Sequence, residues 1–117
     1  MGREAVAQLT VRDAIQRAFE SAGVVVVGQS VGGRESVYAL GVVNEMLNKW
    51  TSDGITHGLS DVSLSTELFD GALSSCLRKN LVTELAEPFG GQASARIQRE
   101  AVMELANLMP LDSELQY

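Results

Sequence analysis

Apolar residues recur every three or four positions along four stretches of the sequence, which is the spacing of one face of an α-helix. Glycine, proline or an Asp-Gly pair bounds these stretches, and such residues end helices or form turns. We therefore expect helices over about residues 10–22, 34–50, 67–86 and 93–108. Short to medium connections favour an antiparallel bundle, so the expected fold class is all-α with about four helices.

Local signals predict the ends of the first two helices. Thr10 followed by Asp13 is typical of an N-cap with an acidic first turn, and Gly23 is a natural stop. The second helix ends at the turn signal Asp53-Gly54, where the glycine can adopt positive φ. We expect its buried stripe to consist of Val37, Leu40, Val43, Leu47 and Trp50, with Glu35, Asn44, Glu45, Asn48 and Lys49 mostly turned away.

Two segments lack helical periodicity. Residues 55–66 mix Gly, Ser, Thr and Asp with isolated apolar residues, which indicates a long loop between the second and third helices. Residues 109–117 follow the last helix and have nothing against which to pack their own backbone. A chain of 117 residues is one domain. We divide it into a helical domain, residues 1–108, and an extended C-terminal tail, residues 109–117.

The charge and the cysteine content exclude several classes of function. The chain has 15 acidic and 9 basic residues, a net charge of −6, so binding nucleic acid by neutralising phosphates is disfavoured. The single cysteine, Cys76, is expected to be a buried thiol, and with one histidine it makes no metal site. We expect no metal and no cofactor. We also expect no membrane association, because neither a secretory signal nor a run long enough to cross a bilayer is visible.

One motif points to catalysis. The segment GQSVG at residues 28–32 matches G-x-S-x-G, the turn that exposes a nucleophilic serine in α/β-hydrolases. The nucleophile would be Ser30, and its base would have to be His57, the only histidine. The sheet of such a fold needs a chain roughly twice this length. We favour a plain loop in a protein that is not an enzyme, with a small serine hydrolase using Ser30 as the alternative.

Four valines, Val24, Val25, Val26 and Val27, precede this motif. They favour an extended backbone, but no second strong strand lies nearby to pair with them. The run can lie across the helices and close the bundle, or part of it can meet a neighbouring subunit. The two interpretations are compatible, because alternate side chains of an extended segment point in opposite directions.

The order of these features along the chain resembles the head-to-tail adaptor (connector) proteins of tailed bacteriophages, above all the tail accessory factors of short-tailed phages. Their layout is a helix ending in a Gly-Val step, a variable loop, a helix with L-x-x-x-N-x-M-L-x-x-W, and then D-G-I. The matching positions are Ala14, Ala18, Gly23, Val24, Leu40, Asn44, Met46, Leu47, Trp50, Asp53, Gly54 and Ile55. The segment 25–33 departs from the family, because it is more apolar and richer in glycine than the family's loops.

The resemblance implies a structural virion protein that has no substrate. It would form a ring of copies, expected to be a dodecamer, beneath the phage portal protein. The ring would extend the DNA channel and provide the attachment site for a downstream tail or nozzle protein. DNA would pass without sequence-specific binding, which agrees with like charge along a channel. The protein would be made in the host cytoplasm and reside in the virion at the head–tail junction.

The resemblance also assigns roles to particular residues. Trp50 would anchor the bundle where the second helix meets the long loop, and the loop, with Asp53, Gly54 and Ile55 at its start, would project toward the portal, the channel or the next tail component. The tail would become ordered on a neighbour, which can be the portal protein, and its expected interface residues are Pro110, Leu111, Leu115 and Tyr117. A helical protein-binding or regulatory module, which would form a dimer alone, remains a third alternative.

Overall fold

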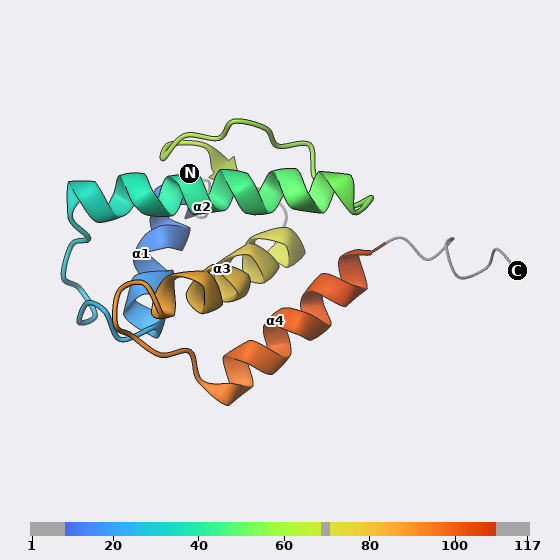
Figure 1. The fold of residues 1–117 in the computed structure, drawn as a ribbon. Coiled ribbons are helices and arrows are strands. Elements are labelled where there is room, and N and C mark those ends of the chain that lie inside the picture. The colour runs from blue at the N-terminus through green and yellow to red at the C-terminus, as the bar shows by residue number, and fades with distance from the viewer. Residues whose placement is uncertain (1–8, 69–70, 110–117) are drawn as a thin grey trace, which may run out of the picture.

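The computed structural model of the chain describes residues 9–68 and 71–109. Within these residues the chain forms four helices and one short pair of strands (Figure 1). The helices are α1 (Val11–Ser21), α2 (Gly33–Ser52), α3 (Gly71–Ala86) and α4 (Ala95–Leu108), and the strands are β1 (Leu9–Thr10) and β2 (Glu67–Leu68). The all-α bundle of about four helices that the sequence predicts is confirmed.

Local chemistry defines both ends of α1. The Thr10 hydroxyl accepts a hydrogen bond from the Asp13 backbone N–H at 3.2 Å, and the Asp13 carboxylate accepts one from the Thr10 N–H at 3.1 Å. This capping box satisfies two backbone donors that the first turn leaves without partners. Gly23, with φ of +77°, follows the last turn in the left-handed conformation that glycine adopts without strain. The predicted start and stop are confirmed.

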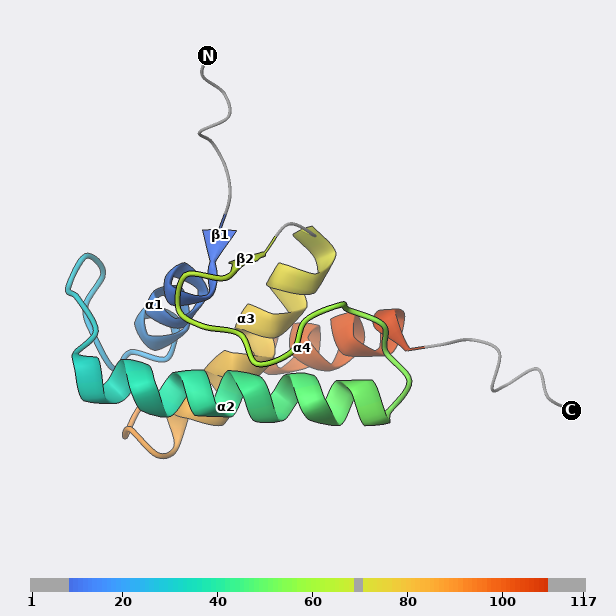
Figure 2. The same ribbon diagram turned by 90° about the horizontal axis from the view of Figure 1, so that it is seen from above.

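The third helix, α3, is the centre of the bundle, because it packs against each of the other three helices. In Figure 1, α2 crosses above α3 and α4 lies below it, and each runs opposite to α3. The view from above shows α1 beside the first half of α2 (Figure 2). The largest fully buried side chains come from α1, α2 and α3: Val11, Ile15, Phe19, Val43, Leu47, Cys76, Leu77, Leu81, Val82 and Leu85. The predicted burial of Cys76 is confirmed.

The fourth helix is much less buried than the others. Ala101 is its one buried residue, while Ile97, Leu105 and Leu108 are half-buried against the core. Its first turn is capped by Ser94, whose side-chain oxygen accepts a hydrogen bond from the Ile97 N–H at 3.1 Å. The start predicted near residue 93 is therefore close to the observed first helical residue, Ala95. None of the described helices combines the length and the apolar character that crossing a bilayer demands.

The start predicted for the third helix is wrong. Glu67 and Leu68, predicted to be helical, form β2 and pair antiparallel with β1 in the register Leu9↔Leu68 and Thr10↔Glu67. The helix itself begins at Gly71. Leu68 is buried in the strand conformation, and the pairing satisfies backbone groups that lie ahead of α1. Periodicity in the sequence could not reveal this pairing, because the partner strand is remote along the chain.

The predicted stripe of α2 is partly wrong at its beginning. Val37 is 69% exposed, whereas Ser36 and Ala39 face the other helices and are buried. The second half of the stripe, Val43, Leu47 and Trp50, is buried as predicted. The buried face at the start of α2 therefore passes through Ser36 and Ala39, about one residue away from the predicted stripe.

Candidate functional site

Ser30 and His57 are separated by the whole length of α2. Ser30 lies shortly before the first residue of this helix, Gly33, and His57 lies shortly after its last, Ser52. A helix of 20 residues is about 30 Å long. The only sheet within the described residues is the pair of two-residue strands, so nothing resembling a hydrolase sheet supports Ser30. The geometry gives the serine-hydrolase alternative no support.

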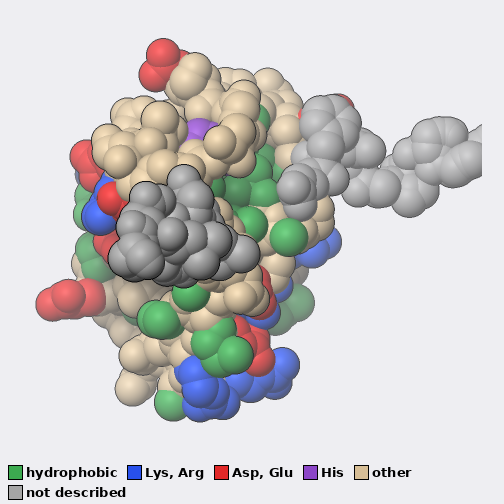
Figure 3. All heavy atoms as spheres, turned by 90° about the vertical axis from the view of Figure 1, so that its right-hand side faces the viewer, with side chains coloured by type: hydrophobic (Ala, Val, Ile, Leu, Met, Phe, Trp, Pro, Cys, Tyr) green, Lys and Arg blue, Asp and Glu red, His purple; other side chains and the backbone are tan. Residues whose placement is uncertain are grey.

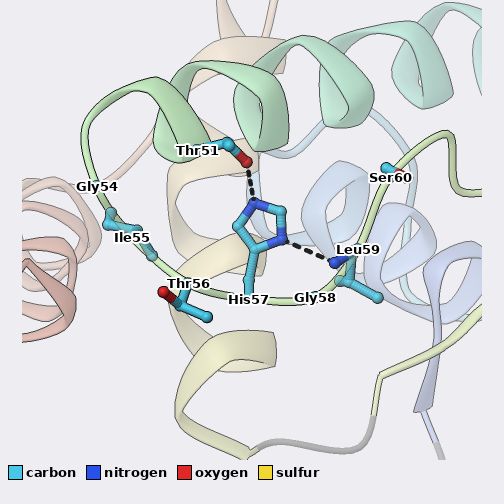
Figure 4. Close-up of a pocket in the computed structure, with 8 residues that line it drawn as sticks. All are labelled: Thr51, Gly54, Ile55, Thr56, His57, Gly58, Leu59 and Ser60. Atoms are coloured by element: carbon cyan, nitrogen blue, oxygen red, sulfur yellow. Dashed lines mark hydrogen bonds between the residues drawn. The ribbon is translucent and has the colours of Figure 1, made fainter.

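The ring of His57 is fully engaged in holding its own loop (Figure 4). Nδ1 accepts a hydrogen bond from the Leu59 backbone N–H at 3.0 Å, while Nε2 lies 3.0 Å from both the Leu47 carbonyl oxygen and the Thr51 hydroxyl oxygen. A backbone N–H can only donate, so Nδ1 must be an acceptor and the proton of the neutral ring belongs on Nε2. Neither nitrogen is left to act as a general base.

The cavity beside this histidine is about 450 Å³ in volume and is lined by Thr51 and residues 54–60. Its polar groups are hydroxyl, imidazole and backbone groups, and no carboxylate or second imidazole lines it among the residues that the structure describes. Over residues 9–68 and 71–109 there is no cluster of three His, Cys, Asp or Glu side chains that could hold a metal ion. The cavity therefore has hydrogen-bonding capacity but no arrangement for acid–base or metal chemistry.

The long loop after α2 is attached to that helix by Asn44, which the helical pattern of the sequence places on the outward face. The Asn44 side-chain amide donates to the Val62 carbonyl at 3.2 Å and accepts from the Val62 N–H at 2.9 Å. One side chain thus satisfies both backbone groups of Val62, as a neighbouring strand would. No local pattern identifies this role, because an asparagine within a helix usually faces solvent.

The residues predicted at the start of this loop fall into two groups. Trp50 and Ile55 are each 4% exposed and join the core where α2 ends, as predicted for Trp50. Gly54 adopts a φ of +94°, which confirms the predicted turn. Asp53 lies at the surface in an ion pair of 3.1 Å with Lys49 of the last turn of α2. Trp50 and Ile55 are thus supports of the loop, while Asp53 pairs with Lys49 at the surface.

The valine run divides into a packed half and an exposed half. Val24 and Val25 are partly buried against the core, and the Val24 N–H donates to the Phe19 carbonyl at 3.0 Å. Val26 and Val27 are 70% and 84% exposed. Closure of the bundle by the run is thus confirmed for its first two residues only. The other two leave apolar surface in solvent.

The two exposed valines are part of a β-turn whose backbone is held by two hydrogen bonds. The Gln29 N–H donates to the Val26 carbonyl at 2.9 Å, and Gly28 adopts a φ of +91° between them. The Gln29 side chain accepts in return from the Val26 N–H at 3.2 Å. We call residues 26–29 the valine turn.

Two side chains of α1 hold the valine turn and the residues after it. The Gln16 amide donates to the Gln29 carbonyl at 2.6 Å and accepts from the Val31 N–H at 3.2 Å. The Glu20 carboxylate accepts from the Gly28 N–H at 3.2 Å and from the Gln16 amide at 2.8 Å. Hydrogen bonds from Gln16 and then from Gly28 lower the pKa of Glu20 below its ordinary value. Val26 and Val27 therefore lie on a loop whose backbone conformation is fixed by hydrogen bonds.

Other exposed apolar side chains occur on α2 and α4. Val37 and Tyr38 lie on the first turns of α2, and the Tyr38 ring is only half-buried although it meets Phe89 edge to face at 5.2 Å. On α4, Val102 and Met103 are 68% and 57% exposed. Exposed apolar side chains scattered over a surface are common in folded proteins, so these positions alone define no interface.

A polar cluster connects α3 to α4. The Lys79 ammonium lies 2.9 Å from Glu100 and 2.6 Å from Glu104, and Arg96 pairs with Glu100 at 3.0 Å. Lys79, followed by Arg96, lowers the pKa of Glu100 to about 2, and Lys79 also lowers the pKa of Glu104. Hydrogen bonds to the two carboxylates raise the pKa of Lys79. These charges neutralise one another, so the cluster fastens α4 to α3 and offers no poised acid or base.

The predicted interface residues of the tail, namely Pro110, Leu111, Leu115 and Tyr117, lie outside the described residues. Neither the models of known protein families nor the curated proteins give a match to this chain.

Proposed function

We propose that the protein is a structural subunit of a tailed bacteriophage, a head-to-tail adaptor that forms a ring beneath the portal protein. The proposal rests on the resemblance of the ordered sequence features to this family. The helical bundle, the long loop after α2 and the turn at Asp53-Gly54 agree with the layout that the resemblance implies. The ring would extend the DNA channel and carry the downstream tail or nozzle protein at the head–tail junction of the virion.

The proposal is carried by the order of the sequence features, and the surface best suited to the subunit contact it requires is the valine turn, which lies in the segment that departs from the family's loops. Val26 and Val27 are the most exposed large hydrophobic side chains among the described residues, and their backbone is held by Gln16 and Glu20 of α1. A preorganised loop loses little conformational entropy when a partner covers it, so the apolar area contributes more fully to association. Such a turn is suited to burial against a neighbouring copy or the portal.

The adaptor role is also compatible with the lack of catalytic geometry around Ser30 and His57. An adaptor needs adhesion surfaces and a passage that does not retain DNA. The net charge of −6 opposes phosphate binding, as a channel wall requires. On this proposal the ring is a dodecamer that contacts the portal protein on one side and the tail on the other.

Assembly with the portal protein of the same phage tests the proposal. Mixed with portal rings, the wild-type chain should co-sediment and be visible in electron micrographs as an added ring below the portal. Val26→Ser combined with Val27→Ser should weaken this binding by about tenfold or more, because two exposed valines lose their apolar contact. Val102→Ser on α4 is the matched control for a generic loss of surface valine.

Two results would contradict the proposal. One is an absence of binding between the wild-type chain and the portal protein at micromolar concentrations. The other is hydrolysis of ester substrates or labelling by serine-directed probes that Ser30→Ala abolishes. A stable dimer of the chain alone, binding a partner other than the portal, would instead favour the regulatory module.

A further inference from the structure

Residues 56–61, the first half of the loop after α2, depend on one side chain for their hydrogen bonds. Ile55, which precedes them, is buried in the core, and Val62, which follows them, is bound by Asn44. Among the residues that the structure describes, every hydrogen bond of residues 56–61 is made by the ring of His57. The imidazole is therefore the one polar attachment of this segment to α2.

The hydrogen bonds of the His57 ring fit only its neutral form. Nδ1 accepts from the Leu59 backbone N–H at 3.0 Å, and Nε2 lies 3.0 Å from the Leu47 carbonyl and Thr51 hydroxyl oxygens, toward which it donates (Figure 4). In a protonated ring both nitrogens carry a proton and neither can accept. The proton on Nδ1 would then face the Leu59 N–H, and two donors with no acceptor between them repel each other. Protonation thus breaks the bond that closes the segment.

No neighbouring charge compensates a protonated ring. The charged side chains of the two segments that contact it are Glu45, Lys49, Asp53 and Asp61. Those on and at the end of α2 are two positions away from Leu47 or Thr51, about 200° around the helix and thus on another face. Among the described residues none of the four forms an ion pair with the ring, and Lys49 pairs with Asp53 instead.

The space-filling view agrees with this environment. Figure 3 shows part of the purple imidazole at the surface, and the atoms around it are tan, which marks backbone and uncharged polar side chains. The cavity beside the ring is lined by Thr51 and residues 54–60, which include no charged side chain other than the histidine itself when it is protonated. Solvent can therefore deliver a proton to the ring, and no carboxylate of the cavity lining holds the charged form in place.

We propose that His57 is a pH-sensitive latch: the neutral ring holds residues 56–61 against the end of α2, and protonation releases them. Histidine is the side chain that ordinarily changes charge between about pH 5 and 8. The hold is present at the alkaline end of this range and is lost as the pH falls through it. Ile55 and Val62 keep their own contacts, so the opening is confined to the segment between them. The latch acts within one chain and does not depend on the proposed ring of copies.

NMR of the full-length, isotope-labelled chain tests the latch. At about pH 8, above the usual range of histidine, the ring ¹⁵N shifts should show a proton on Nε2 and none on Nδ1. Hydrogen exchange of the backbone amides is then compared at about pH 8 and about pH 5. Each rate is divided by that of an unstructured peptide, which removes the pH dependence of the exchange chemistry. The protection of the Leu59 amide should fall by about tenfold or more, because its acceptor becomes a donor.

Two controls separate the latch from a general effect of pH. The Val62 amide is bound by the side-chain amide of Asn44, which does not titrate, so its protection should be the same at both pH values. His57→Gln has no titratable ring, so the protection of Leu59 should no longer depend on pH, whether or not the glutamine holds the segment. Circular dichroism confirms that this variant keeps its helices.

Three results would exclude the latch: a proton on Nδ1 of the neutral ring, a Leu59 protection that does not change with pH, and a pH-dependent protection that persists in His57→Gln. Loss of protection at Val62 together with Leu59 would exclude it as well, because the loop would then open as a whole. Binding to the portal protein, or its absence, decides the adaptor role and leaves the latch unaffected.

Discussion

The side chain of Asn44 binds both backbone groups of Val62, donating to its carbonyl at 3.2 Å and accepting from its N–H at 2.9 Å. Two points of the chain that are 18 residues apart are thereby joined, and the loop after α2 is held along the helix. The valine turn is held in the same manner by Gln16, which bonds the Gln29 carbonyl and the Val31 N–H. In both loops, a side-chain amide makes the backbone hydrogen bonds that a neighbouring strand would otherwise make.

Replacing Asn44 should detach the loop. Asn44→Ala leaves the partly buried backbone groups of Val62 without partners, so we expect the free energy of unfolding to fall by about 1–3 kcal/mol. Asn48→Ala, one turn further along α2 at an exposed position, should change it by less than about 0.5 kcal/mol. Urea unfolding followed by circular dichroism measures the free energy of unfolding of both variants. Equal losses would mean that the loop does not depend on the hydrogen bonds between Asn44 and Val62.

Trp50 should be among the most costly residues to truncate. It is 4% exposed at the end of α2 and packs into the core beside the start of the long loop. Trp50→Ala creates a large cavity and should lower the free energy of unfolding by about 3–5 kcal/mol. Trp50→Phe retains most of the volume and should cost clearly less. A loss below about 1 kcal/mol for Trp50→Ala would contradict the anchoring role.

Two glycines should respond to alanine in opposite directions. At Gly91 a Cβ atom would meet the Ala22 carbonyl oxygen and lie 2.9 Å from Val24 Cγ2, so Gly91→Ala should destabilise the fold by about 1–3 kcal/mol. At Gly41, within α2, nothing lies within 4 Å of the added atom. Gly41→Ala should therefore stabilise the fold by up to about 1 kcal/mol. Thermal melting of the two variants measures both effects, and a stabilising Gly91→Ala would exclude the close approach.

The ion pairs of Glu100 predict a pH dependence of stability. Lys79, followed by Arg96, lowers the pKa of Glu100 from 4.5 to about 2. A group whose pKa is lowered by folding stabilises the folded state above its unfolded pKa. The stabilising contribution of Glu100 is thus complete above about pH 4.5 and is lost as the pH falls through about 2.

The comparison that isolates this effect is between the wild type and Glu100→Gln. Their difference in the free energy of unfolding should be largest near neutral pH and should shrink steadily toward about pH 2, as measured by urea titration at several pH values. Glu84→Gln, an exposed change on α3, is the control for general effects of charge. A difference that stays constant with pH would show that the pairs with Lys79 and Arg96 do not form in solution.

Local rules determine much of this chain. Three features depend only on residues that are close together along the chain: the capping box of Thr10 and Asp13, the stop at Gly23 and the turn at Gly54. They can therefore be predicted from the sequence. The buried half of α2 follows in the same way from the helical spacing of Val43, Leu47 and Trp50. The number of helices and the fold class therefore follow from the amino-acid sequence by itself.

Tertiary structure alone decides what those local rules leave open. Asn44 faces Val62 because a distant loop passes over it, and Val37 is exposed because the packing of α2 buries Ser36 and Ala39 instead. Glu67 and Leu68 become a strand because Leu9 and Thr10 are available to pair with them. Val26 and Val27 stay exposed because Gln16 and Glu20 hold their turn away from the core. Each outcome depends on groups that are remote in sequence, whose proximity is created only when the helices pack.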